Sequence, residues 1–83
     1  MFEVKFSTVA EKKFFKLENL IQDRIKISLE RIRIRPRDYL KHLVGSPFYS
    51  LRVGDYRLII DINAKELIVL VIDLGHRKDV YDK

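Results

Sequence analysis

The sequence predicts an α+β domain in which a two-helix hairpin packs on one face of an antiparallel sheet. Apolar and polar residues alternate in residues 2–6 and again in residues 49–62, and a further β-rich run starts at Leu67. Between them, apolar residues recur at helical spacing in residues 8–17 and 20–34. The predicted order of elements is therefore β-α-α-β-β-β.

The N-terminal part of the chain is expected to cover the sheet. Residues 2–6 form a strand that joins the later strands, because every second residue is apolar. Ser7 or Thr8 caps the first helix, since Thr8 and Glu11 have the spacing of a capping box. The residues expected to point inward from this helix are Ala10, Phe14 and Leu17.

The second helix, residues 20–34, carries an apolar stripe and a basic outer surface. Pro36 disfavours helical geometry at Arg35 and ends the helix. The expected inward residues are Ile21, Ile25, Leu29 and Ile32, widened by Ile27 and Ile34. The basic residues are Arg24, Lys26, Arg31, Arg33, Arg35 and Arg37. They form either a solvated helix face or a surface that follows a nucleic-acid backbone.

An irregular segment, residues 35–47, is expected to lead into a three-stranded meander. Tyr39, Leu40 and Leu43 are predicted to hold this segment against the core. The Gly54-Asp55 turn joins the first two strands of the meander. Pairing their apolar sets places Arg52 and Arg57 on the face that does not carry the core.

Composition excludes several classes of protein. There is no cysteine, so disulfide frameworks and thiolate metal sites are ruled out. Two histidines are too few for a metal centre unless carboxylates complete it, and no cofactor is expected. Residues 67–72 form the longest apolar run, which is too short for a membrane span, and the first residues do not resemble a signal peptide. A cytoplasmic protein is expected. The net charge of +5 favours an acidic partner or a nucleic acid.

The meander carries motifs that resemble those of a known superfamily. Gly54-Asp55-Tyr56-Arg57-Leu58 and Gly75-His76-Arg77-Lys78-Asp79-Val80-Tyr81 resemble the RelE/ParE superfamily of toxins from type II toxin-antitoxin systems, and most closely its RelE branch. The order of elements matches too, so the resemblance implies a single RelE-like domain over residues 1–83. It also implies an endoribonuclease, an mRNA interferase that cleaves messenger RNA in the ribosomal A site, in contact with ribosomal RNA, and inhibits translation.

The resemblance also implies the site. Catalytic roles fall to Arg57, Arg77 and Tyr81, and Arg52 takes the place of a basic residue of the second strand. RNA or phosphate binding is expected of Arg52 and also of His76 and Lys78, which lie in the same C-terminal motif. Ser50 departs from the pattern, since RelE-type enzymes commonly carry another basic residue there.

The expected reaction needs no metal. The RNA 2′-hydroxyl attacks the adjacent phosphorus and leaves a 2′,3′-cyclic phosphate, a step that requires a base, an acid and cations for the phosphoryl charge. Arg57 and Arg77 suit the last task because a guanidinium binds phosphate bidentately and stays charged. Either Tyr81 or His76 transfers the proton, with Tyr81 preferred. The alternatives are that Arg57 pairs with Asp61 and that Tyr81 only packs on the sheet.

The expected partner is an acidic, RelB-like antitoxin that forms a hetero-oligomer with the toxin and wraps the basic domain. Two other functions remain open. One is a ParE-like toxin that inhibits DNA gyrase without nuclease chemistry, and the other is an inert relative that binds only its antitoxin. The position of Ser50 is the main support for the inert relative.

Overall fold

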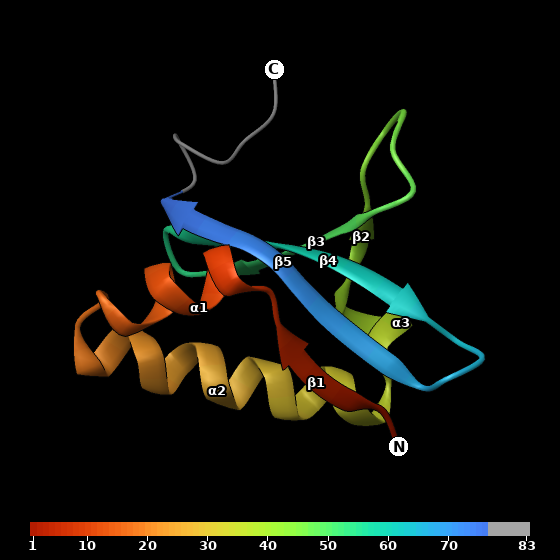
Figure 1. Ribbon diagram of the computed structural model, residues 1–83, viewed down its shortest axis with the longest axis horizontal. Coiled ribbons are helices and arrows are strands. Elements are labelled where there is room, and N and C mark those ends of the chain that lie inside the picture. Colours follow the sequence, from red (N-terminus) through yellow and green to blue (C-terminus); the bar gives the residue numbers. More distant parts are fainter. Residues whose placement is uncertain (77–83) are drawn as a thin grey trace.

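Two helices lie against one face of a five-stranded sheet in the computed structural model, which describes residues 1–76 (Figure 1). The elements are β1 (Glu3–Phe6), α1 (Thr8–Phe15), α2 (Asn19–Ile34), α3 (Pro36–Tyr39), β2 (Lys41–His42), β3 (Tyr49–Val53), β4 (Tyr56–Asn63) and β5 (Ile68–His76). The strands are ordered β1-β5-β4-β3-β2 across the sheet. The predicted α+β class is confirmed, and the structure adds β2 and α3 to the predicted elements.

One strand pairing differs from the fully antiparallel sheet that we predicted. β1 runs parallel to β5, with Phe6 opposite Val71, whereas the other three pairings in residues 1–76 are antiparallel. The helical hairpin separates β1 from the meander, so no tight turn fixes their relative direction. β5 lies between β1 and β4 in the sheet, and its residues Val69 and Val71 are completely buried.

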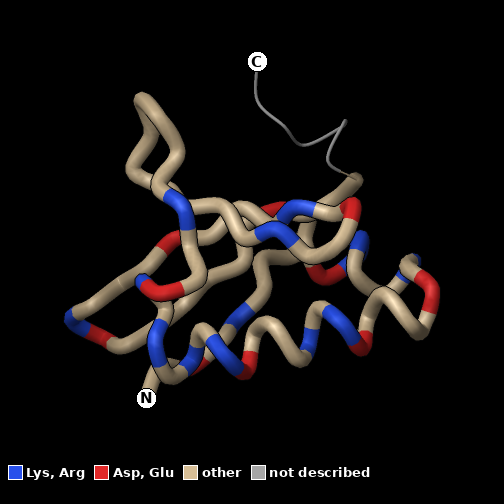
Figure 2. The backbone as a smooth tube through the Cα atoms, turned by 180° about the vertical axis from the view of Figure 1, so that it is seen from behind, with Lys and Arg blue, Asp and Glu red and all other residues tan. Residues whose placement is uncertain are grey.

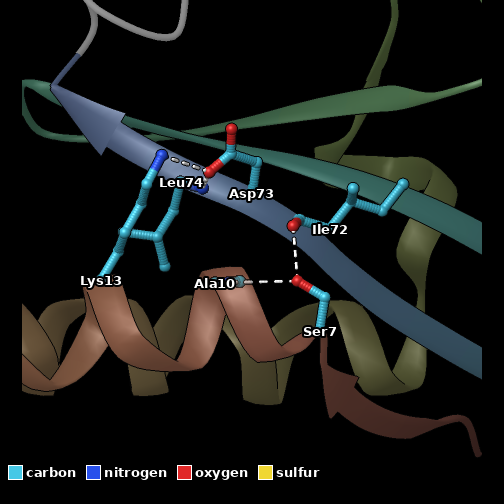
Figure 3. Close-up of polar contacts among 6 residues, drawn as sticks. All are labelled: Ser7, Ala10, Lys13, Ile72, Asp73 and Leu74. Atoms are coloured by element: carbon cyan, nitrogen blue, oxygen red, sulfur yellow. Dashed lines mark hydrogen bonds and ion pairs between the residues drawn. The ribbon is translucent and has the colours of Figure 1, made fainter.

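Ser7 fixes the start of α1 and ties it to the sheet. Its side-chain oxygen accepts a hydrogen bond from the backbone N–H of Ala10 at 3.0 Å and donates one to the carbonyl of Ile72 at 2.6 Å (Figure 3). Ser7, rather than Thr8, is therefore the capping residue. One hydroxyl satisfies a free N–H at the helix start and a carbonyl of β5, so it sets the position of the helix on the sheet.

The core lies between the helices and the sheet. Ala10, Phe14, Ile25, Leu29 and Ile32 are buried against the inner face of the strands. The strands contribute the buried residues Leu51, Val53, Leu58, Ile60, Val69, Val71 and Leu74. This arrangement confirms the predicted inward stripes and leaves the opposite face of the sheet, the open face, without a helix (Figure 1).

Two predicted contributors to the core are instead exposed. Ile27 and Ile34 project away from the stripe formed by Ile25 and Ile32, and more than half of each side chain is accessible. Tyr39, expected to hold its segment against the core, is also about half exposed. Leu40, which was predicted to hold the same segment, does pack on the core. Within residues 1–76, no helix combines the length and apolarity needed to cross a bilayer.

Candidate functional site

Two arginines lie opposite each other on the open face. Arg52 on β3 is in register with Arg57 on β4, and Arg57 is in register with Gly75 on β5. The tight turn at Gly54, whose φ of 60° is in the left-handed region, allows only this pairing of the two strands. Figure 2 shows basic positions on both strands at this end of the sheet. The prediction that Arg52 and Arg57 share a face outside the core is confirmed.

The two arginines differ in their surroundings. Arg52 is exposed, and its Nε donates a long hydrogen bond of 3.4 Å to the carbonyl of Gly54. Arg57 is half-buried, and its Nε is enclosed by the protein. Like charges directly opposite each other on paired strands destabilise a sheet. The pair therefore places two positive charges side by side on the open face.

Apolar residues form the floor beside this charge. Ile59 is half-buried on the open face next to the arginine row, and Leu70, opposite Asp61, is half-buried one row further along. Further along, Asp61 and Lys5 line a hollow of about 240 Å³ together with Asn63, Ile68 and Leu70. Ile59 lies between Arg57 and Asp61 on this face, so the predicted alternative of an Arg57–Asp61 pair has an apolar residue between its members.

His76 lies on the helix side of the sheet rather than beside the arginines. It is in register with Tyr56, and their rings meet edge to face at 5.7 Å. Both line a hollow of about 350 Å³ with Lys13 of α1 and with Lys16, the residue after α1. The structure thus brings together Arg52 and Arg57 of the predicted site and places His76 across the sheet from them.

The cause of this placement is a bulge in β5. Ile60 pairs with Val71 and Ile59 pairs with Asp73, so Ile72 is the extra residue. A bulge of this kind shifts the alternation of all later side chains by one residue. Leu74 and His76 consequently face the helices, while Gly75 comes next to Arg57 on the open face.

Lys13 and Asp73 lie beside the bulge. The Lys13 Nζ is 2.8 Å from an Asp73 carboxylate oxygen, which also accepts the backbone N–H of Leu74 (Figure 3). Arg77, Lys78 and Tyr81 of the predicted site lie outside the described residues. His76 is the last residue of β5 and is in register with Tyr56, one residue beyond the row of Arg57 and Gly75.

Lys41 is a basic residue of the open face that the sequence did not indicate. It is exposed on β2 and in register with Ser50 on β3. A strand of two residues is too short to show alternation, so only the register identifies the face of Lys41. His42, the next residue, packs on the ring of Tyr49 at 5.0 Å on the core side.

The basic outer surface of α2 is partly engaged in structural contacts. Arg33 pairs with Glu30 at 2.7 Å, and Arg37 donates to the hydroxyl of Tyr49 at 3.1 Å. Basic positions outnumber acidic ones along this helix (Figure 2). No three His, Asp or Glu side chains in residues 1–76 are close enough together to hold a metal ion.

Comparison with known proteins extends these observations. The model of the ParE toxin of type II toxin-antitoxin systems (parDE) matches residues 4–81. The Mycobacterium tuberculosis RelBE2 toxin-antitoxin complex matches at 25% identity and a TM-score of 0.83, covering 92% of this chain and 91% of that chain. The intact E. coli RelBE toxin-antitoxin complex matches at 26% identity and a TM-score of 0.80, covering 92% of this chain and 96% of that chain.

An archaeal structure is also similar. The RelB-RelE antitoxin-toxin complex of Methanococcus jannaschii matches at 25% identity and a TM-score of 0.72, covering 93% of this chain and 94% of that chain. No curated protein sequence matched. The shared architecture therefore spans nearly the whole chain, in bacterial and archaeal structures alike.

Proposed function

This chain belongs to the ParE toxin family of type II toxin-antitoxin systems, within the RelE/ParE superfamily, and from that premise we propose that it is an endoribonuclease acting on messenger RNA at the ribosome. The open face would bind the RNA. The observation that carries the proposal is the cross-strand pair of Arg52 and Arg57. Two guanidinium groups opposite each other repel, and a phosphate placed between them removes that repulsion.

The proposed reaction follows from the groups on this face. The RNA 2′-oxygen loses its proton to a base and attacks the neighbouring phosphorus, and the bond to the 5′-oxygen breaks as that oxygen takes up a proton. Arg57, which is half-buried, stabilises the charge that develops on the phosphoryl oxygens. Arg52, which is exposed, binds the incoming RNA backbone. The apolar floor at Ile59 accommodates a base.

Residues beyond β5 complete the proposal. Arg77 is assigned to the phosphoryl charge, Lys78 to the RNA backbone and Tyr81 to proton transfer, on the basis of the superfamily resemblance. Since His76 faces the helix side, Tyr81 is the better candidate for proton transfer. The ribosome supplies the positioning of the RNA that this small surface lacks.

The test is induction in cells followed by mapping of transcript 5′ ends. We expect cuts at fixed positions within codons, reduced at least about tenfold by Arg57→Lys, which keeps the charge and loses the bidentate fork. Arg35→Lys, the same exchange at an exposed arginine just after α2, is the matched control and is expected to cut normally. Intact transcripts after induction would refute the nuclease. Efficient cutting of ribosome-free RNA would refute the dependence on the ribosome.

A second candidate function has support from the family match itself. A ParE-like toxin that inhibits DNA gyrase would have the same fold, which does not determine activity. The same induction experiment separates the two functions when gyrase-linked DNA breaks are mapped in parallel. DNA breaks with intact transcripts would favour the gyrase inhibitor, whereas transcript cuts without DNA breaks favour the nuclease.

We also propose an acidic antitoxin as the partner, as in the RelB-RelE complexes that this chain resembles. Leu20, Ile27 and Ile34 are exposed by 63%, 56% and 63% at seven-residue spacing along α2. Arg24 and Arg31 lie between them on the same face of the helix. An amphipathic segment with apolar and acidic residues fits this face of α2, because it covers the apolar side chains and neutralises the arginines.

Co-purification with the co-expressed cognate antitoxin tests this surface. Ile27→Glu is expected to weaken capture of the antitoxin at least about tenfold, since it places a carboxylate opposite an acidic partner. Val9→Glu changes an exposed apolar residue of α1 in the same way and serves as the control. Equal capture by both variants would show that the antitoxin binds elsewhere.

A further inference from the structure

We propose that Lys41 supplies the cation that is missing at Ser50 and binds an RNA phosphate on the open face. This inference rests on the proposed nuclease function and adds a residue to its site. Ser50 lies on the same face of β3 as Arg52, between Lys41 on one side and Ile59 on the other. The serine leaves the centre of a basic surface without a charge, and the adjacent strand provides one.

The register places Lys41 within reach of the arginines. Residues directly opposite on antiparallel strands have Cβ atoms about 4.5–5.5 Å apart, and diagonal neighbours are about 7–8 Å apart. Lys41 is opposite Ser50 and diagonal to Arg52, which in turn is opposite Arg57. The three cations therefore form one continuous patch across β2, β3 and β4.

The small size of Ser50 allows the lysine to act there. Only 7% of Ser50 is exposed, so neighbouring side chains cover its short hydroxymethyl group and form the surface at this position. A lysine can lay its four-carbon stem over such a position and keep the ammonium in water. Lys41 forms no ion pair with any residue of the described part of the chain, so its charge is available to a ligand.

A phosphate is the ligand that fits this patch. Arg52 and Arg57 offer planar forks, and the ammonium of Lys41 is a compact point charge with three donors. Together they neutralise a phosphate and its neighbour along a single strand of RNA. Lys41 could instead protect the edge of the sheet. β2 is an edge strand, and an exposed lysine on an edge strand discourages pairing with a second molecule.

Four variants of the full chain, released from the antitoxin, separate the two roles in cleavage of mRNA on purified ribosomes. Lys41→Gln is expected to cut at least about tenfold more slowly, with the effect mainly in KM, and Lys41→Arg to stay within about threefold of the unmodified protein. Ser50→Lys added to Lys41→Gln should restore cutting, because it returns the charge to the same place. Lys65→Gln, in the turn between β4 and β5, is the control for charge alone.

A second readout tests phosphate binding directly. For a non-cleavable single-stranded RNA, the slope of log affinity against log salt is expected to fall by about 0.7 in Lys41→Gln, the share of one phosphate contact. Normal cutting and an unchanged slope in Lys41→Gln would overturn the role of Lys41 while leaving the nuclease intact. Absence of cutting by the unmodified protein would refute the proposed function and this inference with it. Loss of solubility with normal cutting would assign Lys41 to edge protection instead.

Discussion

Replacing Arg52 by glutamine should make the protein more stable and less active at once. The substitution removes one of two like charges that lie opposite each other on β3 and β4. Such a pair costs about 0.2–1 kcal/mol, and the exposure of Arg52 to solvent puts this one near the lower end. The hydrogen bond lost with it, 3.4 Å long to the carbonyl of Gly54, is too long to contribute much.

The free energy of unfolding of Arg52→Gln is therefore expected to rise by about 0.3 kcal/mol in low salt, which for a domain of this size raises Tm by about 1–2 °C. In 1 M salt the Debye length is about 3 Å and the difference should vanish. Cleavage of mRNA, in contrast, should fall at least about tenfold, equivalent to about 1.4 kcal/mol of transition-state stabilisation. Urea denaturation at two salt concentrations and the ribosome assay measure both effects.

The opposite signs of the two effects make the reasoning refutable. A residue kept for the fold loses stability when it is removed, so a loss of more than about 1 kcal/mol in Arg52→Gln would assign Arg52 a structural role. Lys65→Gln removes an exposed positive charge from the turn between β4 and β5 and should change neither quantity. A stability gain in that control as well would trace the effect to net charge rather than to the arginine pair.

The remaining predictions concern the scaffold, and urea denaturation at pH 7 measures all of them. Ser7→Ala should lower the free energy of unfolding by about 1–2 kcal/mol, because it removes a helix cap and a hydrogen bond to β5. Thr8→Ala should lower it by less than about 0.5 kcal/mol. Ile25→Ala should cost about 2–5 kcal/mol and Ile27→Ala, on the exposed face, under about 0.5. Leu67→Gly should stabilise by about 0.5 kcal/mol, since Leu67 has a φ of 55°. A loss of stability in Leu67→Gly would show that the backbone at Leu67 is not strained.

The part of the site that lies on a hairpin could be predicted from the sequence. Between Arg52 and Arg57 the chain has only a tight turn at Gly54, and a tight turn fixes which residues of two strands are opposite. Alternation on each strand then decides the face. The apolar stripe of α2 was predictable for a similar reason, although Ile27 and Ile34 show that apolar residues on the opposite side of a helix can remain exposed.

The features that escaped prediction depend on contacts between distant segments. Lys41 owes its place to a two-residue strand that exists only because β3 lies beside it. The parallel direction of β1 could not be predicted, because the helical hairpin and not a tight turn separates β1 from its partner β5. Alternation counted along β5 from Val71 would have put His76 on the open face, and the extra residue at Ile72 reverses that outcome.

The same bulge gives the open face its composition at the end of β5. If the alternation had continued unchanged, a leucine and a histidine would lie on the face of the arginines, whereas the bulge turns Leu74 into the core and brings Gly75 next to Arg57. A glycine adds no side chain between the arginine and whatever binds there, and it lets another backbone approach closely. The one inserted residue thus adds Leu74 to the core on one side of the sheet. On the other side it leaves the position beside Arg57 without a side chain. The bulge therefore serves both the stability of the core and the proposed binding of RNA, which is why we regard it as part of the proposed site.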